Sequence, residues 1–180
     1  MKTVCFNLGA WQGGKTTRFA KRYDLVVSVE PVRENYELLV QTIIEKKLKN
    51  VIPVFVAISS KSGVGKIYMG RTSQGHSLYW KRGFPDSTKT RSTLTTSWDN
   101  LVDSLNIDHI DYAKVDIEGA EEDLLSGMTK VFPERMLIET HGRHGVTDVK
   151  NILRLLEEKG YVLERERGRK YIYVKRAIEK

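Results

Sequence analysis

Residues 9–16, Gly-Ala-Trp-Gln-Gly-Gly-Lys-Thr, have the composition of a ligand-binding loop. The loop follows the apolar run Val4–Leu8 and precedes a stretch that favours a short helix from Thr16. A glycine-rich turn between a strand and a helix lets backbone N–H groups approach a charged ligand at the helix N-terminus. The sequence therefore predicts a site for a charged cofactor or substrate at this turn.

Two patterns fit the same loop and imply different chemistry. Residues 9–16 match G-x-x-x-x-G-K-[ST], the Walker A pattern of phosphate-binding loops. With Gly9, Ala10 and Gly13 the loop also fits G-A-x-x-G and resembles the first loop of an S-adenosylmethionine (SAM) methyltransferase. The rest of the chain has to decide between the two interpretations.

Apolar runs alternate with helix-favouring stretches, which predicts an α/β fold with a mostly parallel sheet and helices on both faces. Strands are expected at 3–8, 25–29, 51–58, 112–116 and 135–140, and an antiparallel C-terminal hairpin at 161–163 and 171–174, giving seven strands. Helices are expected at 16–23, between 31 and 50, at 97–105, after Glu121 to about residue 126, and between 147 and 160. Residues 66–69 could form a hairpin arm, and residues 70–97 are expected to be irregular.

Polar residues or tight turns stand at the carboxyl end of each predicted parallel strand. They are Asn7 with the loop from Gly9 to Gly13, Glu30, Ala57–Ser59, Asp116 with Glu118, and Glu139 with His141. In open α/β sheets, ligands bind at the carboxyl ends of the strands. We therefore expect these residues to form one site.

Glu30 helps to decide between the two interpretations of the loop. It lies 17 residues after Gly13, at the end of the second predicted strand. A carboxylate about 20 residues beyond a glycine-rich loop is placed to accept hydrogen bonds from ribose hydroxyls. A phosphate loop needs instead a magnesium-binding aspartate after an apolar strand. Asp116 could serve, but Lys114 interrupts its strand.

The bulk composition is that of a single soluble domain over residues 1–180. Of these residues 40% are apolar and 29% are charged, and no apolar run is long enough to cross a membrane. The N-terminus lacks the apolar core of a signal peptide, so we expect a cytoplasmic protein without a membrane partner. Cys5 is the sole cysteine, and we expect a buried small residue rather than a nucleophile.

Positive charge is concentrated in residues 61–97. The chain has a formal net charge of +7, and this stretch holds seven Lys and Arg residues against the single acid Asp86. Tyr79, Trp80 and Phe84 lie among them. We expect a basic insert or lid over the site, which could attract nucleic acid or an anionic small molecule or sugar.

Four segments, in this order, resemble the FkbM-type methyltransferases, a branch of the class I SAM-dependent fold. They are residues 6–13 (FNLGAWQG), 29–39 (VEPVRENYELL), 114–121 (KVDIEGAE) and 138–141 (IETH). The third segment is the most specific, and the ordered set is stronger than the glycine-rich loop alone. The resemblance implies a Rossmann-like class I methyltransferase fold and SAM as the cofactor.

The resemblance also implies roles for individual residues. The implied cofactor ligands are Asn7, Gly9, Ala10, Gly13, Glu30, Pro31, Ala57, Ile58, Ser59 and Asp116. The glycine-rich loop would hold the methionine part of SAM, Glu30 the ribose, and residues 57–59 would border the adenine. Asp116 would lie near the transferred methyl group. The family usually has an acid where this chain has Asn7, which can hydrogen-bond but cannot pair with the SAM ammonium as an ion.

The candidate catalytic residues are Asp116, His141 and Glu118. His141 could deprotonate a hydroxyl because an ordinary histidine has a pKa of about 6.5. Asp116 could act in the same way, or it could cap the following helix. These residues and Glu139 could also form an oxygen-rich cation site, but no tight ligand spacing supports it, so no metal is expected.

The sequence favours a SAM-dependent methyltransferase that modifies a hydroxyl of an unidentified small molecule or sugar, which could be anionic. It contains no N/D-P-P-Y/F tetrapeptide, a motif that amino-directed methyltransferases often carry. One alternative is a small P-loop nucleotide kinase, based on residues 9–16. Another is a nucleic-acid-binding module on the same fold, based on residues 61–97.

Overall fold

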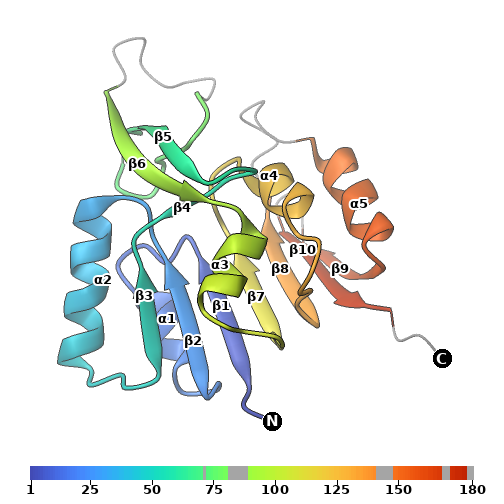
Figure 1. Cartoon of the computed structure of the whole chain (residues 1–180), viewed down its shortest axis with the longest axis horizontal. Coiled ribbons are helices and arrows are strands. Elements are labelled where there is room, and N and C mark those ends of the chain that lie inside the picture. Colours follow the sequence, from blue (N-terminus) through green and yellow to red (C-terminus); the bar gives the residue numbers. More distant parts are fainter. Residues whose placement is uncertain (71, 81–88, 141–147, 168–170, 178–180) are drawn as a thin grey trace.

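The computed structural model describes residues 1–70, 72–80, 89–140, 148–167 and 171–177. The strands of its large sheet are β1 (Val4–Leu8), β2 (Leu25–Val29), β3 (Val51–Val54), β7 (Tyr112–Val115), β8 (Arg135–Glu139), β9 (Tyr161–Arg167) and β10 (Tyr171–Arg176). Their order is β3-β2-β1-β7-β8-β10-β9 (Figure 1). Strand β10 runs antiparallel to β8 and β9, whereas the pairs β3–β2, β2–β1, β1–β7 and β7–β8 are parallel. The predicted mostly parallel seven-stranded sheet with its C-terminal hairpin is confirmed.

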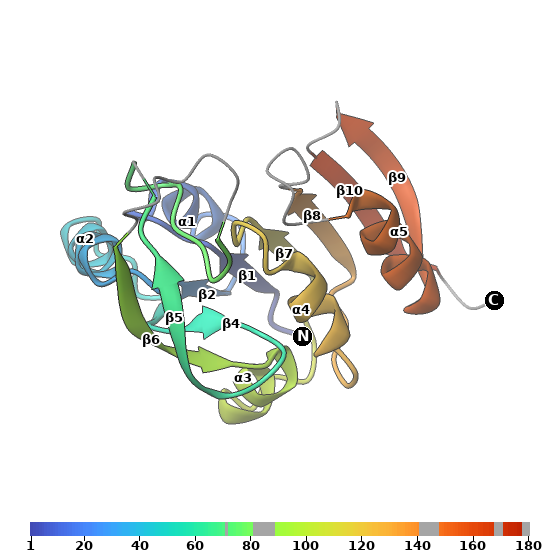
Figure 2. The same ribbon diagram turned by 90° about the horizontal axis from the view of Figure 1, so that it is seen from above.

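Helices cover both faces of this sheet (Figure 2). The helices are α1 (Gly14–Phe19), α2 (Arg33–Glu45), α3 (Trp98–Ser104), α4 (Glu121–Ser126) and α5 (Val149–Glu158). Helices α1 and α2 lie on one face, and α3, α4 and α5 on the other. Successive side chains along β1 point to opposite faces of the sheet. The Phe6 ring centroid lies 5.1 Å from that of Trp98 on α3, whereas the Asn7 side chain binds Thr16 on α1.

A second, three-stranded sheet stands over the carboxyl end of the large one (Figure 1). It contains β4 (Ala57–Ile58), β5 (Gly63–Tyr68) and β6 (Thr90–Thr96), in the order β4-β6-β5. The prediction of one continuous strand over 51–58 was therefore wrong. The chain leaves the large sheet after β3, an edge strand that tolerates Pro53, and pairs with β6 at Ala57.

The prediction that residues 70–97 are irregular was also wrong in part, because β6 occupies residues 90–96. This strand is polar and lacks the apolar alternation that we used to find strands. Its β-branched threonines nevertheless favour extended backbone. Its antiparallel partner β5 begins at Gly63, three residues before the predicted hairpin arm.

The helix expected at 97–105 is present as α3, and Ser97 caps it, because its side chain accepts a hydrogen bond from the Asn100 N–H at 3.3 Å. Cys5 is fully buried, and burial raises the pKa of its thiol, which makes it a packing residue rather than a nucleophile. Within the described ranges, no helix is long and apolar enough to cross a membrane.

Candidate functional site

A cavity of about 570 Å³ lies at the carboxyl ends of the central parallel strands. This volume is within the range of about 300–1,000 Å³ that is typical of small-molecule and cofactor sites. The residues expected in the site that line it are Gly9, Ala10, Glu30, Pro31, Ala57, Ile58, Asp116, Glu118 and Glu139. The structure thus brings together residues from five separate parts of the sequence.

Three predicted ligands do not line this cavity. Asn7 is fully buried beneath it, where its Nδ2 donates to Thr16 Oγ1 at 3.0 Å. Gly13 is the N-cap of α1 and packs toward α2, and the Ser59 hydroxyl donates to Asp123 at 3.2 Å. Their direct contact with a cofactor stays a prediction. His141 lies outside the described residues.

Gly9 allows two strand ends to come unusually close. Its φ of +74° is in the left-handed region, and a Cβ built on it would lie 1.8 Å from the carbonyl oxygen of Asp116. The N–H groups of Gly9 and Ala10 both donate to the carbonyl oxygen of Val29, at 3.0 and 2.9 Å. A side chain at position 9 would therefore separate the ends of β1 and β7.

The Glu30 carboxylate is held in a fixed position at the end of β2. Its Oε2 accepts a hydrogen bond from the Trp11 N–H at 2.9 Å, and its Oε1 accepts one from the Val32 N–H at 3.1 Å. The Asn35 amide lies 3.4 Å from Oε1. Burial raises the pKa of this carboxyl group, although the hydrogen bonds oppose the shift. The group is thus a positioned acceptor at the cavity wall.

Asp116 lies between two lysines. Lys114 Nζ is 2.8 Å from Asp116 Oδ2, and Lys15 Nζ is 3.7 Å from the same oxygen. The Lys114 side chain is only 3% exposed, whereas that of Lys15 is 50% exposed. Burial lowers the pKa of Lys114, and the charge of Asp116 opposes this shift. The role of Lys114 was not predicted, although a lysine inside an otherwise apolar strand is a signal that could have indicated it.

Residues 72–80, which lie within the expected basic insert of residues 61–97, form a strap along the cavity, which Ser73, Ser77 and Leu78 line. The Asn35 amide donates to the Ser73 carbonyl oxygen at 2.8 Å, and Trp11 Nε1 donates to Ser73 Oγ at 3.3 Å. Further along the strap, Ser77 Oγ donates to the carbonyl oxygen of Glu118 at 2.5 Å. The strap is therefore bound both to the α2 side and to the loop after β7. No sequence pattern indicates these long-range contacts.

Glu118 has a backbone conformation that is uncommon for a residue with a side chain. Its φ is +57°, and Gly119 follows with φ +109°. A left-handed non-glycine residue costs roughly 1–2 kcal/mol, and such strain often occurs at functional sites. The turn is stabilised by Ser77 and by the Glu121 side chain, which accepts from the Gly119 N–H at 3.1 Å. Glu121 therefore supports the loop from a buried position.

The cavity combines charges of both signs with an apolar wall. Its carboxylates are Glu30, Asp116, Glu118 and Glu139, its cationic side chains Lys15, Arg18 and Lys114, and its apolar wall includes Val56, Ile58 and Ile67. The described residues contain no group of three or more His, Cys, Asp or Glu side chains arranged to hold a metal ion. The arrangement suits an organic ligand with a cationic centre, hydroxyl groups and an apolar ring.

Comparisons with known proteins agree with this geometry. Residues 8–163 match the methyltransferase FkbM domain. A search of curated protein sequences found no match to the chain. The family match does not favour the phosphate-loop kinase that the Walker A pattern suggested.

Several solved structures share this fold at low sequence identity. The putative methyltransferase yhhF from Escherichia coli has a TM-score of 0.56 and 14% identity, covering 98% of this chain and 78% of that one. The M. capricolum TrmK complex with S-adenosylhomocysteine has a TM-score of 0.55 and 10% identity, covering 97% and 62%. The Methanococcus jannaschii fibrillarin pre-rRNA processing protein has a TM-score of 0.55 and 15% identity, covering 99% and 68%. These likenesses support the fold.

Proposed function

The chain belongs to the FkbM family of SAM-dependent methyltransferases, and we propose that it transfers the methyl group to a hydroxyl oxygen. The observation that carries this proposal is the carboxylate of Asp116, which lines the cavity and is held by the buried Lys114. A fixed carboxylate beside the reacting centre can orient an acceptor hydroxyl and draw its proton away.

The residues that line the cavity fit SAM. We assign the ribose hydroxyls to Glu30, because its carboxylate is fixed at the end of β2. The adenine ring fits the apolar wall that includes Ala57 and Ile58, and the backbone at Gly9 and Ala10 suits the methionine part. Bound SAM supplies an electrophilic methyl group on a positively charged sulfur.

The protein then has two tasks, alignment and proton removal. Asp116 holds the acceptor hydroxyl through its carboxylate, while Lys114 keeps that carboxylate in place. Glu118, on the neighbouring strained turn, and His141 are the other candidates for taking the proton. The strap formed by residues 72–80 limits the access of water to this region of the cavity.

Oxygen is the favoured acceptor atom for two reasons. The chain lacks the N/D-P-P-Y/F tetrapeptide of many amino-directed methyltransferases. Its cavity also offers four carboxylates, which suit the removal of a hydroxyl proton. The acceptor is a small molecule or a sugar, and contact with nucleic acid through residues 61–97 stays a prediction.

Trideuteromethyl-SAM identifies the acceptor atom directly. The protein is incubated with this cofactor and a metabolite extract, and products that gain 17 mass units are isolated by mass spectrometry. We expect a methyl ether that survives treatment with mild base. A methylated amine, or a base-labile methyl ester, would overturn the proposal of a hydroxyl acceptor while leaving the methyltransferase assignment intact.

A further inference from the structure

A second cavity, of about 320 Å³, lies beside the first. Leu78 on the strap lines both cavities, so this part of the strap forms the wall between them. The polar side chains that line the second cavity belong to Ser59, Ser60, Lys61, Ser62, Lys66, Tyr79 and Thr95. Of these residues, only Ser59 has a predicted role in the methyl transfer, as part of the region that borders the adenine.

We propose that the second cavity is an anion subsite that binds a phosphate group of the acceptor. This inference rests on the proposed function, because it describes the molecule whose hydroxyl is methylated. It also goes further, because it names a chemical group that the acceptor carries.

The charge of the second cavity carries this proposal. Lys61 and Lys66 both line it, and no carboxylate among the residues that the structure describes does so. Across the described parts of the chain, no ion pair involves either lysine, and both side chains are exposed. The first cavity, in contrast, is lined by four carboxylates as well as by Lys15, Arg18 and Lys114. The charged side chains that line the second cavity, among the described residues, are both cationic, and this suits an anion.

The hydroxyl groups of the second cavity fit phosphate oxygens. Ser60 and Ser62 lie in the turn between β4 and β5, next to Lys61, and the Ser62 hydroxyl also accepts a hydrogen bond from the Asn100 amide at 2.7 Å. Serine hydroxyls donate hydrogen bonds, and lysine acts as a mobile point charge, which is a common combination at phosphate sites. The hydroxyls of Ser59 and Tyr79 both donate to Asp123, at 3.2 and 2.6 Å, so these two residues serve as a fixed wall.

The strap relates the subsite to the reacting centre. Ser77 lines the first cavity and binds the carbonyl oxygen of Glu118, whereas Tyr79 lines the second. Leu78 between them touches both spaces. An acceptor whose phosphate is held by Lys61 and Lys66 would therefore extend past Leu78, so that its hydroxyl group enters the first cavity.

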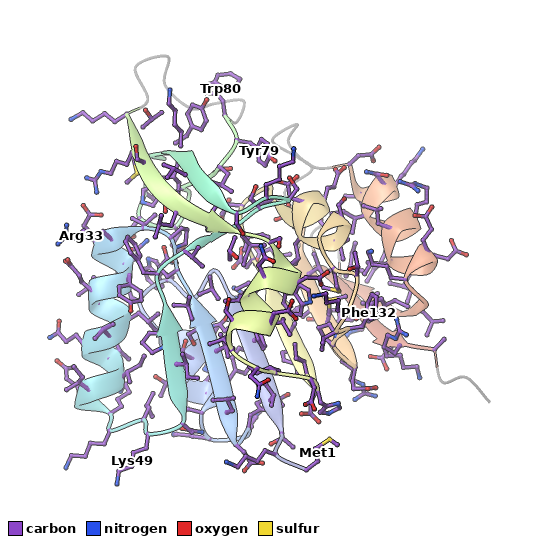
Figure 3. The ribbon with its side chains drawn as sticks, viewed as in Figure 1. Met1, Arg33, Lys49, Tyr79, Trp80 and Phe132 are labelled. Carbon is purple, nitrogen blue, oxygen red and sulfur yellow. The ribbon has the colours of Figure 1, made fainter. Side chains whose placement is uncertain are left out.

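The test is a titration of the full-length, ¹⁵N-labelled protein with inorganic phosphate and with ribose 5-phosphate, at an ionic strength kept constant with sodium chloride. We expect saturable shifts of the amide resonances of residues 59–66 and of Tyr79. The double variant Lys61→Gln, Lys66→Gln should lower the affinity for ribose 5-phosphate at least 10-fold. The matched control is Lys46→Gln, Lys49→Gln, which removes the same charge and should change nothing. Lys46 is the C-cap of α2, and Lys49 lies at the opposite end of the molecule from Tyr79 (Figure 3).

Two results would overturn the subsite. One is an affinity that the Lys61 and Lys66 substitutions leave unchanged, and the other is a set of shifts that maps to Lys15 and Arg18 in the first cavity. A single-stranded RNA decamer gives a third arm. If it binds more than 100-fold tighter than ribose 5-phosphate, the surface serves a nucleic acid and the proposal of a small phosphorylated acceptor is wrong.

Binding of S-adenosylhomocysteine, measured by calorimetry on the same samples, separates this inference from the proposed function. Normal binding in the double variant together with lost phosphate affinity supports the subsite. Normal binding without any phosphate site overturns the subsite alone. A nitrogen-methylated product in the trideuteromethyl experiment overturns the proposal of a hydroxyl acceptor, and the measured phosphate affinity is unaffected by that result.

Discussion

The ammonium group of Lys114 lies 2.8 Å from Asp116 Oδ2 and 3.2 Å from the carbonyl oxygen of Gly9. One buried side chain thus connects the loop after β1 with the loop after β7. Gly9 and Asp116 also approach each other directly, since no Cβ would fit at position 9. The geometry of the proposed methyl-transfer centre therefore depends on Lys114 and Gly9 together.

Lys114→Met should lower kcat/KM strongly while changing the free energy of unfolding little. The substitution keeps an apolar side chain of similar length in the buried site, and Asp116 is not left as an isolated buried charge, because its side chain is 21% exposed and Lys15 remains 3.7 Å away. Asp116 then loses its orienting partner, so we expect kcat/KM to fall about 10- to 100-fold, or roughly 1.4–2.8 kcal/mol of transition-state stabilisation. Steady-state assays and urea unfolding measure the two effects. Lys175→Met, at an exposed position of β10, is the control, and an unchanged kcat/KM for Lys114→Met would remove Lys114 from the account.

Gly9→Ala should destabilise the protein, whereas Gly14→Ala should not. A Cβ at position 9 would lie 1.8 Å from the Asp116 carbonyl oxygen, and the backbone there has a left-handed φ. A Cβ at Gly14, in contrast, would have no heavy atom within 4 Å. We expect a loss of about 2–4 kcal/mol for Gly9→Ala from strain and overpacking. Gly14 is a helical residue, so its change to alanine should give a gain of up to about 1 kcal/mol. Equal unfolding free energies for the two variants would contradict the structure of this loop.

Glu30→Gln tests the ribose assignment and has a defined dependence on pH. Burial raises the pKa of Glu30 above its ordinary 4.5, so its stabilising contribution is complete below pH 4.5 and is lost as the pH rises through the folded-state pKa. Glutamine has no such dependence. Urea unfolding should therefore show that wild type loses stability relative to Glu30→Gln between pH 4 and pH 7.

The same Glu30→Gln variant should bind S-adenosylhomocysteine about 10- to 100-fold more weakly, because the amide cannot accept hydrogen bonds at both positions. Calorimetry at pH 7 gives this number. Glu37→Gln, on an exposed face of α2, provides the comparison. Full affinity in Glu30→Gln would mean that the ribose lies elsewhere.

Glu118→Asn distinguishes a functional carboxylate from a structural turn residue. Asparagine tolerates a left-handed conformation better than glutamate, so stability should stay constant or rise by up to about 1 kcal/mol. If the Glu118 side chain acts on the acceptor, kcat should fall at least about 10-fold. Thermal unfolding and single-turnover assays give the two values. A variant with full activity would restrict Glu118 to shaping the turn.

The sequence predicted the large sheet well because its strands are short apolar runs between clear helix and turn signals. It failed at the second sheet, where β6 is polar and threonine-rich and where the chain leaves β3 after Pro53. Pairing of β4 with β6 joins residues 57–58 to residues 95–96. Such pairing depends on tertiary contacts that no local pattern encodes.

The site was predictable where it depends on strand ends and not where it depends on the strap. Gly9, Glu30 and Asp116 follow from the rule that ligands bind at the carboxyl ends of parallel strands. Lys114 and Ser77 act through contacts to residues that are distant in sequence or hidden by burial. Asn7 stood at a strand end as well, but alternation along β1 directs its side chain away from the cavity and toward Thr16.

The most direct test of the central claim is a crystal structure of the protein with S-adenosylhomocysteine. We predict the adenosine ribose hydroxyls on the Glu30 carboxylate, and the sulfur on the Asp116 side of the first cavity. Density for S-adenosylhomocysteine in another place, or crystals that bind Mg-ATP over residues 9–16 and not S-adenosylhomocysteine, would contradict the account.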